Sequence, residues 1–551
     1  MSGVLNATHG KARRRLAIVG CGSSGLITLK YACDLLPDWE IQCFEASGEI
    51  TGCWGDPYPG FVSTSTKFTT QFACFPKYSA NTSSAPKCEK NEFFQGDEYG
   101  QYLSEFADHF KLKQHVHLHT RVEQIEPVDD GDQWRLTLVD NREGTDQDSS
   151  EDFDHVIVCT GLAAVPRKID STIPQLTPAD IYGPIPIREK RVVVLGGGES
   201  AVDLADRLSK PQHQNEVYLS LRSGIRVSPR YHPVRGVPSD FLRNRLMLSI
   251  HEDLRNWIGQ RFVEARIRYQ WVFERIFPSR VKRQSESDLD KVALESRKQW
   301  DYRLTRHAKD DLFNMFHNKS DGFLDSVAKG RIKIIGAPKD NNFNSFEGFS
   351  GDASVSFKPD YVIPSIGYRM QLQHLFRGML AFSDFFLGCC HVRRANVHLV
   401  GYARPVIGNI PTISEMQSRY VCKMIAGLIS RPESIVTDHA HDLQAQQVRY
   451  QAFQITNVYP VEMFPYCDRL AGLMGESLKG ERGRGMLTWC RQQLEPATTL
   501  HYLSPEKLPP QVRHPPIYLP IVLIAVLIAL KPVDWIYRLW LRVVAKRPSG
   551  L

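Results

Sequence analysis

The sequence predicts an α/β fold with two Rossmann-like dinucleotide-binding domains, one inserted into the other, and a C-terminal membrane-associated helical tail. Two strand–turn–helix segments with closely spaced glycines predict the two domains, and an apolar run near residue 520 predicts the tail. With 551 residues, 42% of them hydrophobic, the chain is long enough for two or three domains with cores of their own.

The first glycine-rich turn lies near the start of the sequence. The apolar run RLAIVG is typical of a buried parallel strand, and the pattern GxGxxG follows at Gly20, Gly22 and Gly25. These glycines permit a tight turn, the approach of backbone to a pyrophosphate, and close packing of helix on strand. The start of the helix, which includes Ser24, favours phosphate. The next strand ends at Glu45, where a carboxylate would bind ribose hydroxyls, and we assign this site to FAD.

The second turn repeats this pattern but ends differently. It comprises Gly196, Gly198, Glu199, Ser200 and Ala201, and it follows the strand RVVVLG. The next strand ends in Arg222 and Ser223 instead of an acid. An acid would repel a 2′-phosphate, whereas arginine accommodates one, so we expect NADPH here. The alternative is that Arg222 is an ordinary solvated loop arginine.

Two further strand–glycine segments, 153–161 and 359–368, mark where the chain is expected to cross between the domains. The predicted ranges are 12–165 and 341–450 for the FAD domain, 166–340 for the NADP domain with a helical insert around 241–316, and 451–510 for a C-terminal extension. The aromatic and arginine-rich insert is expected to cap the active site, with a membrane-facing amphipathic insert as the alternative.

Residues 515–547 predict a membrane anchor. The uncharged stretch IYLPIVLIAVLIAL reaches about 21 Å as a helix, short of a roughly 30 Å hydrocarbon layer. The following residues alternate apolar and aromatic side chains with Arg538 and Arg542, as an interfacial helix does. We expect either a monotopic or a marginally spanning tail, with a buried core helix as the alternative. The net charge of +7 gathers at the two ends, and nothing predicts nucleic-acid binding.

Several segments resemble the flavin-containing monooxygenases of the class B flavoprotein group. They are GCGSSG, ITGCWG, STSTKFTTQFACFP, GGGESA, GRIKIIGAPK and the segment 398–427, and the likeness covers about residues 15–475. The resemblance implies an enzyme in which NADPH reduces FAD, oxygen forms a C4a-hydroperoxyflavin, and a small nitrogen- or sulfur-containing nucleophile is oxygenated. It also implies a membrane-associated location with the catalytic domain facing the cytoplasm, the membrane being the endoplasmic reticulum if the protein is eukaryotic. Whether the chain forms a homo-oligomer stays open.

The resemblance assigns further residues to the cofactors. Thr64 and Lys67 fall in the segment beside the reactive flavin ring and are the candidate catalytic residues. The other positions that match cofactor contacts are Gly52, Cys53, Trp54, Gln71, Val122, Thr160, Gly161 and Gln417.

Two features depart from the family pattern. Thr64 stands where the family usually has an asparagine, and a hydroxyl offers one donor where an amide offers two. The family's linker fingerprint FxGxxxHxxxY is replaced by a shorter segment that retains only Tyr182. The alternatives to monooxygenation are therefore an NADPH oxidase-like release of hydrogen peroxide and a flavin-binding protein with little turnover.

Three histidines, His115, His117 and His119, are predicted on one face of a surface strand. No carboxylate or cysteine stands near them at ligand spacing, so no metal site is predicted.

Overall fold

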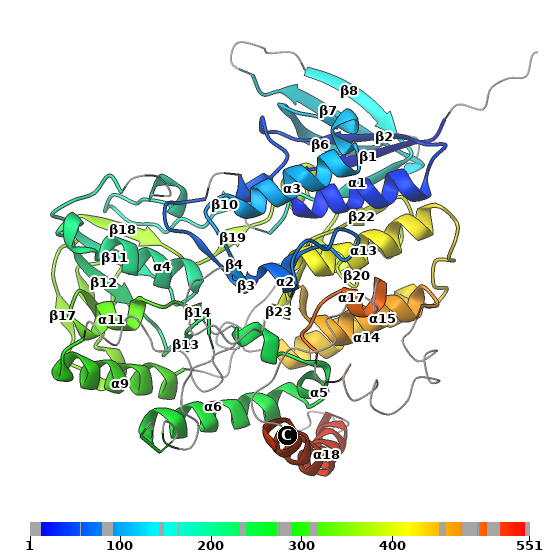
Figure 1. Cartoon of the computed structure of the whole chain (residues 1–551). Helices are drawn as coiled ribbons and strands as arrows, with labels where there is room; N and C mark the ends of the chain where they lie inside the picture. The colour runs from blue at the N-terminus through cyan, green and yellow to red at the C-terminus, as the bar shows by residue number, and fades with distance from the viewer. Residues whose placement is uncertain are drawn as a thin grey trace, which may run out of the picture.

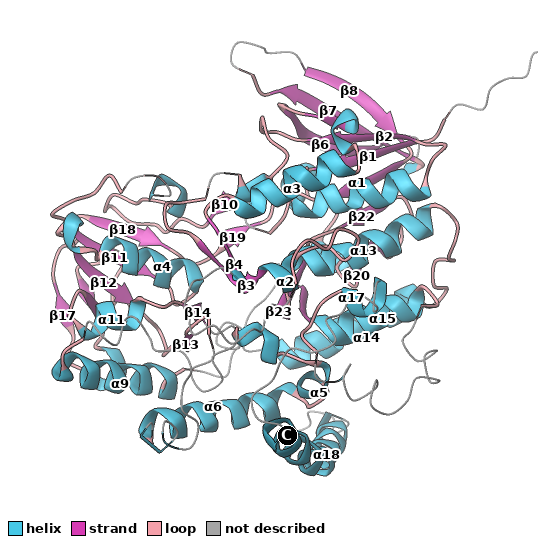
Figure 2. Cartoon of the chain, viewed as in Figure 1, coloured by secondary structure: helices cyan, strands magenta, loops and turns pink. Residues whose placement is uncertain are grey.

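In the computed structural model (Figure 1), the described residues are 13–55, 57–79, 92–128, 131–142, 148–162, 165–181, 183, 185–231, 238–269, 271–272, 275, 289–308, 318–450, 459–476, 493, 495–503 and 518–545. Two sheets, each flanked by helices, form the two lobes, as the colouring by secondary structure shows (Figure 2). The predicted pair of Rossmann-like domains is confirmed. Tyr182 lies outside the described residues.

The first domain is built on a seven-stranded sheet with the order β20-β21-β22-β9-β1-β2-β5. Its strands are β1 (Arg15–Val19), β2 (Glu40–Phe44), β5 (Val116–His117), β9 (His155–Val158), β20 (Phe385–Phe386), β21 (Cys390–His391) and β22 (Val397–Leu399). The run β22-β9-β1-β2-β5 is parallel. It joins segments from both ends of the discontinuous domain, as predicted.

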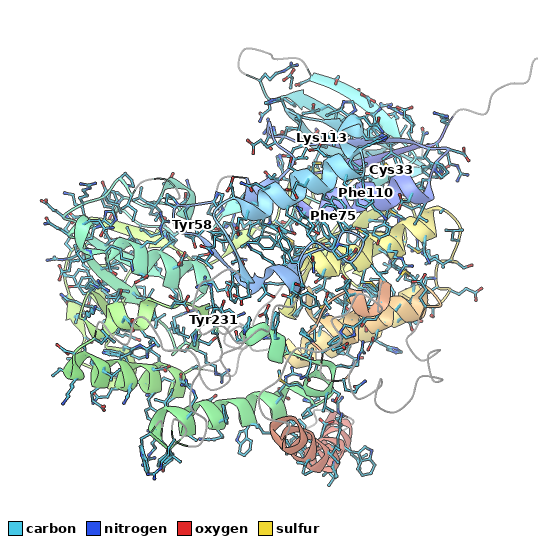
Figure 3. All side chains as sticks on the ribbon, viewed as in Figure 1. Cys33, Tyr58, Phe75, Phe110, Lys113 and Tyr231 are labelled. Atoms are coloured by element: carbon cyan, nitrogen blue, oxygen red, sulfur yellow. The ribbon has the colours of Figure 1, made fainter. Side chains whose placement is uncertain are left out.

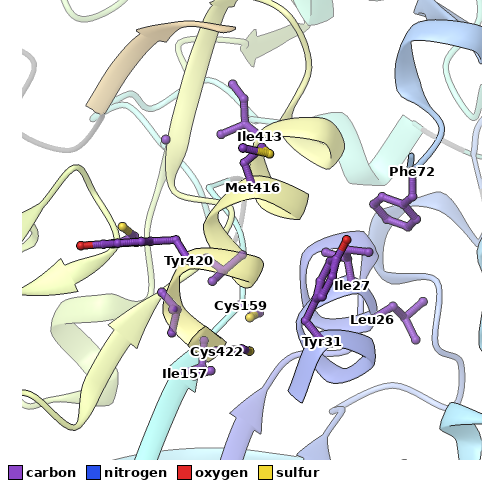
Figure 4. Close-up of a cluster of buried hydrophobic side chains, with 14 of the residues drawn as sticks. Leu26, Ile27, Tyr31, Phe72, Ile157, Cys159, Ile413, Met416, Tyr420 and Cys422 are labelled. Atoms are coloured by element: carbon purple, nitrogen blue, oxygen red, sulfur yellow. The ribbon is translucent and has the colours of Figure 1, made fainter. Parts of the chain in front are cut away.

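Side chains alternate across β1 and build a core on each face of this sheet. Leu16 and Ile18 face α1 (Ser23–Leu35), α3 (Glu98–His109) and α13 (Ile410–Ile425), whereas Ala17 and Val19 face a three-stranded sheet. That second layer is β6 (Thr120–Val128), β7 (Gln133–Asp140) and β8 (Asp148–Phe153). Figure 4 shows α1 and α13 packed together through Ile27, Cys159 and Met416.

The second domain is a four-stranded parallel sheet with the order β15-β12-β11-β18. Its strands are β11 (Arg191–Leu195), β12 (Glu216–Ser220), β15 (Ile332–Ile335) and β18 (Tyr361–Pro364), covered by α4 (Glu199–Leu208) and α11 (Phe323–Ala328). The predicted domain end at residue 340 is wrong, because β18 pairs with β11 inside this sheet. The chain returns to the first domain after β18, where β19 (Tyr368–Arg369) pairs with β10 (Val165–Pro166).

The helical insert leaves the second domain and returns to it at one place, because β13 (Val227–Ser228) pairs with β14 (Asn318–Lys319). Its described helices are α5 (Arg245–Leu248), α6 (Glu252–Arg268) and α9 (Lys291–Arg306), so the prediction of helix is confirmed there. Figure 1 shows α6 running beneath both lobes. Residues 276–288 of the predicted insert lie outside the described residues.

The first domain continues beyond residue 450, contrary to the predicted separate extension. β24 (Tyr459–Glu462) pairs with β23 (Ala403–Ile407), and Met463, Phe464 and Cys467 of α15 (Met463–Leu473) are buried in the core around α1 and α13. The apolar side chains of α15 gain stability by leaving water, and the core of the first domain is the apolar surface against which they pack. The other named elements are β3 (Val62–Thr66), β4 (Phe93–Gln95), β16 (Ser345–Phe346), β17 (Val355–Ser356), α2 (Lys67–Thr70), α12 (Leu372–Leu375), α14 (Ile435–Tyr450) and α17 (Leu500–Leu503).

The predicted anchor folds as the helix α18 (Tyr518–Ala545). Among the described residues, no helix combines the length and apolarity needed to span a membrane. α18 lies against the corner between α5 and α6 (Figure 1), where Asp534 Oδ1 accepts from the His251 N–H at 2.6 Å and Lys531 Nζ donates to the Ser249 carbonyl at 3.0 Å.

The three histidines do not share one strand, so that prediction is wrong. His115 ends a 3-10 turn, His117 is in β5, and His119 has a positive φ of 55°. The strand is interrupted because β5 pairs with β2 over only two residues before the chain turns into β6.

Glu415 of α13 is fully buried and holds three segments together. Its carboxylate accepts from the N–H groups of Ala73 and Cys74 at 2.8 and 3.1 Å and from the Thr499 hydroxyl at 2.7 Å. Glu415→Ala would leave these buried donors without an acceptor, and we expect it to lower the free energy of unfolding by at least about 3 kcal/mol. Urea denaturation checks this, with the exposed Glu433→Ala as a control expected to change it by under about 0.5 kcal/mol.

Candidate cofactor and active site

In the first glycine-rich turn, backbone atoms and no large side chains surround the amino end of α1. Gly20 has a φ of +94°, and a Cβ there would lie 3.0 Å from the Cys159 carbonyl oxygen. A Cβ on Gly25 would lie 1.9 Å from the Gly20 carbonyl oxygen, so the helix can start here only with glycine. Gly22 is the N-cap residue, and no side chain caps the helix. The free N–H groups of the first turn therefore form a cradle that fits a pyrophosphate.

Gly22 and Gly52 face each other, so the glycine–tryptophan turn belongs to the same site. A Cβ on Gly22 would lie 3.5 Å from the Gly52 Cα, and Gly52 itself has a φ of +57°. Cys53 is exposed, whereas the Trp54 ring packs on Phe61 and Tyr99. The two glycine turns, distant in sequence, thus form one backbone surface.

Glu45 lies at this surface, as the ribose assignment requires. Its Oε2 accepts from the Cys21 N–H at 2.7 Å, and its Oε1 accepts from the Ser47 N–H at 2.9 Å. Ser24 is buried and its hydroxyl shares a 2.8 Å hydrogen bond with Ser414. The geometry therefore fits an adenosine ribose at Glu45 and gives Ser24 a role in joining α1 to α13.

Two glutamines assigned to cofactor contacts are occupied by the protein instead. Gln71 accepts from the N–H groups of Lys77 and Tyr78 and donates to the Tyr78 carbonyl. Gln417 accepts from the Gly401 N–H at 3.0 Å and donates to the Tyr466 hydroxyl at 2.8 Å. Because both side chains are buried and hydrogen-bonded, they support the walls of the site.

The remaining assignments on the first domain fall at its strand ends. Thr160 follows β9 and shares a 2.6 Å hydrogen bond with the Tyr402 hydroxyl, and the neighbouring Gly161 has a φ of +78°. Val122 is in β6 at a bulge opposite β7. These positions stay predictions of cofactor contact.

The second turn is open at the amino end of α4. Gly196 has a φ of +120°, and a Cβ there would lie 2.4 Å from the Ser365 carbonyl oxygen. Gly198 is the N-cap with no side-chain cap, Ser200 is exposed, and Ala201 is fully buried against the sheet. This arrangement also fits a phosphate.

Arg222 follows the end of β12 and is exposed, and Ser223 is partly exposed beside it. Parallel strands bring their carboxyl ends to one edge of a sheet, so Arg222 lies at the same edge as the second turn. A cation there fits the 2′-phosphate of NADP.

The two predicted catalytic residues, Thr64 and Lys67, contact different parts of the protein. Lys67 Nζ pairs with Glu98 at 2.8 Å, away from the second domain, whereas the Thr64 carbonyl accepts from Lys319 Nζ. The adjacent Asn318 Nδ2 donates to the Gly197 carbonyl at 2.7 Å. Neighbouring residues therefore tie the flavin segment to the second turn.

Around this junction lies a group of charged residues that the sequence did not reveal: Glu199, Arg230, Asp240, Arg243, Lys319 and Arg404. Burial lowers the pKa of Lys319 to about 8, opposed by the nearby carboxylates. Desolvation raises the pKa of Glu199, although its side chain keeps solvent access, and the surrounding cations oppose that rise. Only Glu199 lies in a recognisable motif, and the other five are scattered over the sequence with no spacing pattern to connect them.

Tyr58 and Asp203 connect the domains beside the second turn. Tyr58 donates to Asp203, and the Arg207 guanidinium lies 4.4 Å from the Tyr58 ring centre (Tyr58 is labelled in Figure 3). Burial raises the pKa of Asp203 to about 6 from its ordinary 3.8.

This pKa of Asp203 predicts a pH dependence of stability. The folded state binds more protons than the unfolded state between pH 4 and 6, so stability falls as the pH rises through that window. Relative to Asp203→Asn, the wild type should lose up to about 3 kcal/mol over this range. Unfolding free energies of both proteins from pH 4 to 7 check this, and parallel curves would contradict it.

Comparison with known proteins agrees with this geometry. The family model described as flavin-binding monooxygenase-like matches residues 13–288. The chain belongs to the flavin-containing monooxygenase family. It is therefore an oxidoreductase that uses FAD and NADPH.

Named relatives of this monooxygenase family are distant in sequence. A 4-hydroxybenzoate brominase (decarboxylating) of Marinomonas mediterranea is 24% identical over 447 residues, covering 76% of this chain and 75% of the relative. Flavin-containing monooxygenase 1 of Homo sapiens is 24% identical, with 76% and 75% coverage. The solved OTEMO complex with FAD and NADP has a TM-score of 0.57 at 15% identity, covering 84% of this chain and 97% of that one, and it shows the shared fold.

Proposed function

We propose that this monooxygenase oxygenates a small molecule at a soft nitrogen or sulfur atom, with NADPH as reductant. The observation that carries the proposal is the junction at residues 318–319, where Asn318 contacts the second turn and Lys319 contacts the flavin segment at Thr64. Hydride transfer needs two cofactors close together, and these contacts bring their expected sites together.

Bound FAD, once reduced by NADPH, would supply the chemistry that activates oxygen. Overall, NADPH, a proton and O₂ are consumed. For a thioether substrate, one oxygen atom forms a bond with the sulfur lone pair, which oxidises the sulfur by two electrons, and the other leaves as water.

The residues of this chain bind and orient the reactants. Gly20, Gly22 and Gly52 would admit the FAD pyrophosphate, and Arg222 would hold the 2′-phosphate of NADPH. Thr64 offers its hydroxyl near the reacting groups, while Lys319 fixes its carbonyl.

The test is spectroscopic and uses the full chain. Purified protein should carry flavin absorbance that NADPH bleaches under anaerobic conditions, and oxygen should restore it. With a thioether such as thioanisole, sulfoxide should form in proportion to NADPH consumed. Stoichiometric hydrogen peroxide without sulfoxide would favour the oxidase-like alternative, and flavin that NADPH does not bleach would refute the enzyme proposal.

We also propose that α18 holds the enzyme on the surface of a membrane, the endoplasmic reticulum in a eukaryotic cell, with its catalytic domains in the cytoplasm. Lys531, Asp534 and Arg538 of α18 contact the protein, whereas Trp535, Ile536 and Trp540 are more than half exposed. At roughly 100° per residue, Ile536 and Trp540 lie on the side of the helix opposite Lys531, Asp534 and Arg538, and Trp535 lies at the edge between the two sides. A helix with its polar side on the protein and its apolar side outward suits a lipid surface.

Flotation with phosphatidylcholine–phosphatidylserine vesicles tests this location. The full chain should float, and Trp535→Ser with Trp540→Ser should reduce flotation severalfold. Val292→Ser, which removes a still more exposed apolar side chain from α9, is the control and should float as the wild type does. Equal flotation of all three proteins would contradict the proposal.

A further inference from the structure

The contact between Tyr58 and Asp203 ends a chain of aromatic rings that starts at the glycine–tryptophan turn. The Trp54 ring packs edge-on against Phe61 with the ring centres 5.9 Å apart, and Phe61 packs in the same way against Tyr58 at 5.5 Å. The Phe61 N–H also donates to the Tyr58 carbonyl at 3.0 Å. Edge-to-face ring pairs prefer a defined geometry. The Tyr58 hydroxyl is therefore fixed relative to the glycine–tryptophan turn.

On its other side, Tyr58 contacts α4 of the second domain through two side chains (Figure 3). Its hydroxyl donates to Asp203, and the Arg207 guanidinium lies 4.4 Å from its ring centre. Arg207 is itself held in place, because it donates to the carbonyls of Ile181 and Gly183 at 3.1 and 3.3 Å. Residues 203 and 207 are four apart, so they lie on one face of the helix. Tyr58 is thus attached to this face by both its hydroxyl and its ring.

This face of α4 moves together with the second turn. Asp203 stands four residues after Glu199, the first residue of the helix, which is about 6 Å along the helix axis. Ala201 and Ala205 are fully buried, so the helix has no room to shift against its sheet. A displacement of Tyr58 relative to Asp203 would therefore displace the first cofactor site relative to the second turn.

The segment that follows Tyr58 is attached to the second domain at a separate place, the base of the insert. The three consecutive carbonyls of residues 62–64 accept from Arg230, at 2.6 and 2.9 Å, and from Lys319. Arg230 in turn pairs with Asp321 at 3.0 Å. Two separate points of attachment fix the angle between two bodies as well as their distance, which one point alone does not. The contact at α4 is the second of these points.

We propose that Tyr58 and Asp203 are positioning residues for the reduction of FAD, because their contact sets the second turn, with its nicotinamide cofactor, at the right distance and angle from the first cofactor site. Arg207 supports this contact by holding the Tyr58 ring. Transfer between bound reactants depends steeply on geometry, and misplacement by about 1 Å can lower a rate roughly 100-fold. The inference rests on the reduction of FAD by NADPH in the proposed function, and it does not depend on which substrate is oxygenated.

Anaerobic stopped-flow reduction of the FAD-loaded full chain at pH 7.5 tests this role. At this pH the Asp203 carboxyl group, with its pKa of about 6, is ionised, so the bond that it accepts is charge-assisted. Tyr58→Phe removes the hydroxyl and keeps the ring beside Arg207. We expect the limiting rate of flavin reduction at saturating NADPH to fall at least about tenfold, with the Kd of NADPH within about twofold of the wild-type value.

Tyr302→Phe is the matched control for this substitution. Tyr302 is on α9 of the insert, and its hydroxyl makes no hydrogen bond within the described part of the chain, so both values should stay unchanged. A Tyr58→Phe protein that is reduced at the wild-type rate would overturn the proposal. A weaker Kd with an unchanged limiting rate would assign Tyr58 to the binding of NADPH and would overturn it as well.

The double variant Tyr58→Phe with Asp203→Ala shows whether the two residues act through each other. Asp203→Ala alone should slow flavin reduction by a similar factor, and the double variant should be no slower than the slower single variant. Losses that multiply would show that the residues act separately and would contradict the proposal. Retained flavin and an unchanged circular dichroism spectrum show that each variant is folded, and Tyr58→Phe decides alone if Asp203→Ala is not. A wild type that NADPH does not bleach would refute the proposed function and this inference with it, whereas a wild type and a Tyr58→Phe protein that bleach equally fast would refute this inference alone.

Discussion

Replacing Gly22 with leucine is expected to abolish flavin retention. The Cβ position of Gly22 points at the Gly52 backbone at 3.5 Å, so an alanine fits but the rest of a leucine side chain does not. A larger side chain would also fill the space through which a pyrophosphate reaches the N–H groups of α1. Purified Gly22→Leu should contain at most about a tenth of the wild-type flavin, a change of about 1.4 kcal/mol or more in binding.

Two controls show whether the loss is specific to the cradle. Gly259→Leu places the same side chain on exposed α6, where a Cβ meets no atom within 4 Å, and it should retain full flavin. Circular dichroism and thermal unfolding should show that apo Gly22→Leu is folded. A folded Gly22→Leu that purifies fully yellow would exclude this turn as the FAD site.

Local patterns in the sequence predicted the two turns because each is a short-range structure. The strand, the glycines and the helix lie within about twenty residues, and the contact that requires glycine at position 25 is with Gly20 of the same turn. The contacts that limit Gly20 and Gly196 are with Cys159 and Ser365, which are distant in sequence, so only the local part of each turn was predictable. The strand order of the two sheets agrees with one domain inserted into the other. The position of β18 was missed, because a strand does not reveal from its own residues which of two parallel sheets it joins.

The group of charged residues around residues 318–319 could not be predicted for the opposite reason. Glu199, Asp240, Lys319 and Arg404 come from four distant segments of the sequence, and only the packing of the insert and the two domains brings them together. A lone arginine such as Arg243 has no sequence context that distinguishes it from a surface residue. The roles expected for Gln71 and Gln417 illustrate the same limit, since their positions in a family pattern do not show where their amide groups point.

Replacing Arg222 with alanine is expected to change the choice of nicotinamide cofactor. Arg222 is exposed at the carboxyl end of β12, next to the open amino end of α4, where a 2′-phosphate would lie. Charge-assisted hydrogen bonds of this kind contribute about 1.5–3 kcal/mol, so kcat/KM for NADPH should fall roughly 10- to 100-fold. NADH lacks the 2′-phosphate, so its kcat/KM should change less than about threefold.

Lys329→Ala, at the opposite edge of the same sheet, removes an exposed cation and should leave both values unchanged. Anaerobic flavin reduction measures each value directly, and an equal loss for NADPH and NADH would show that Arg222 acts on the shape of the second turn and not on the phosphate.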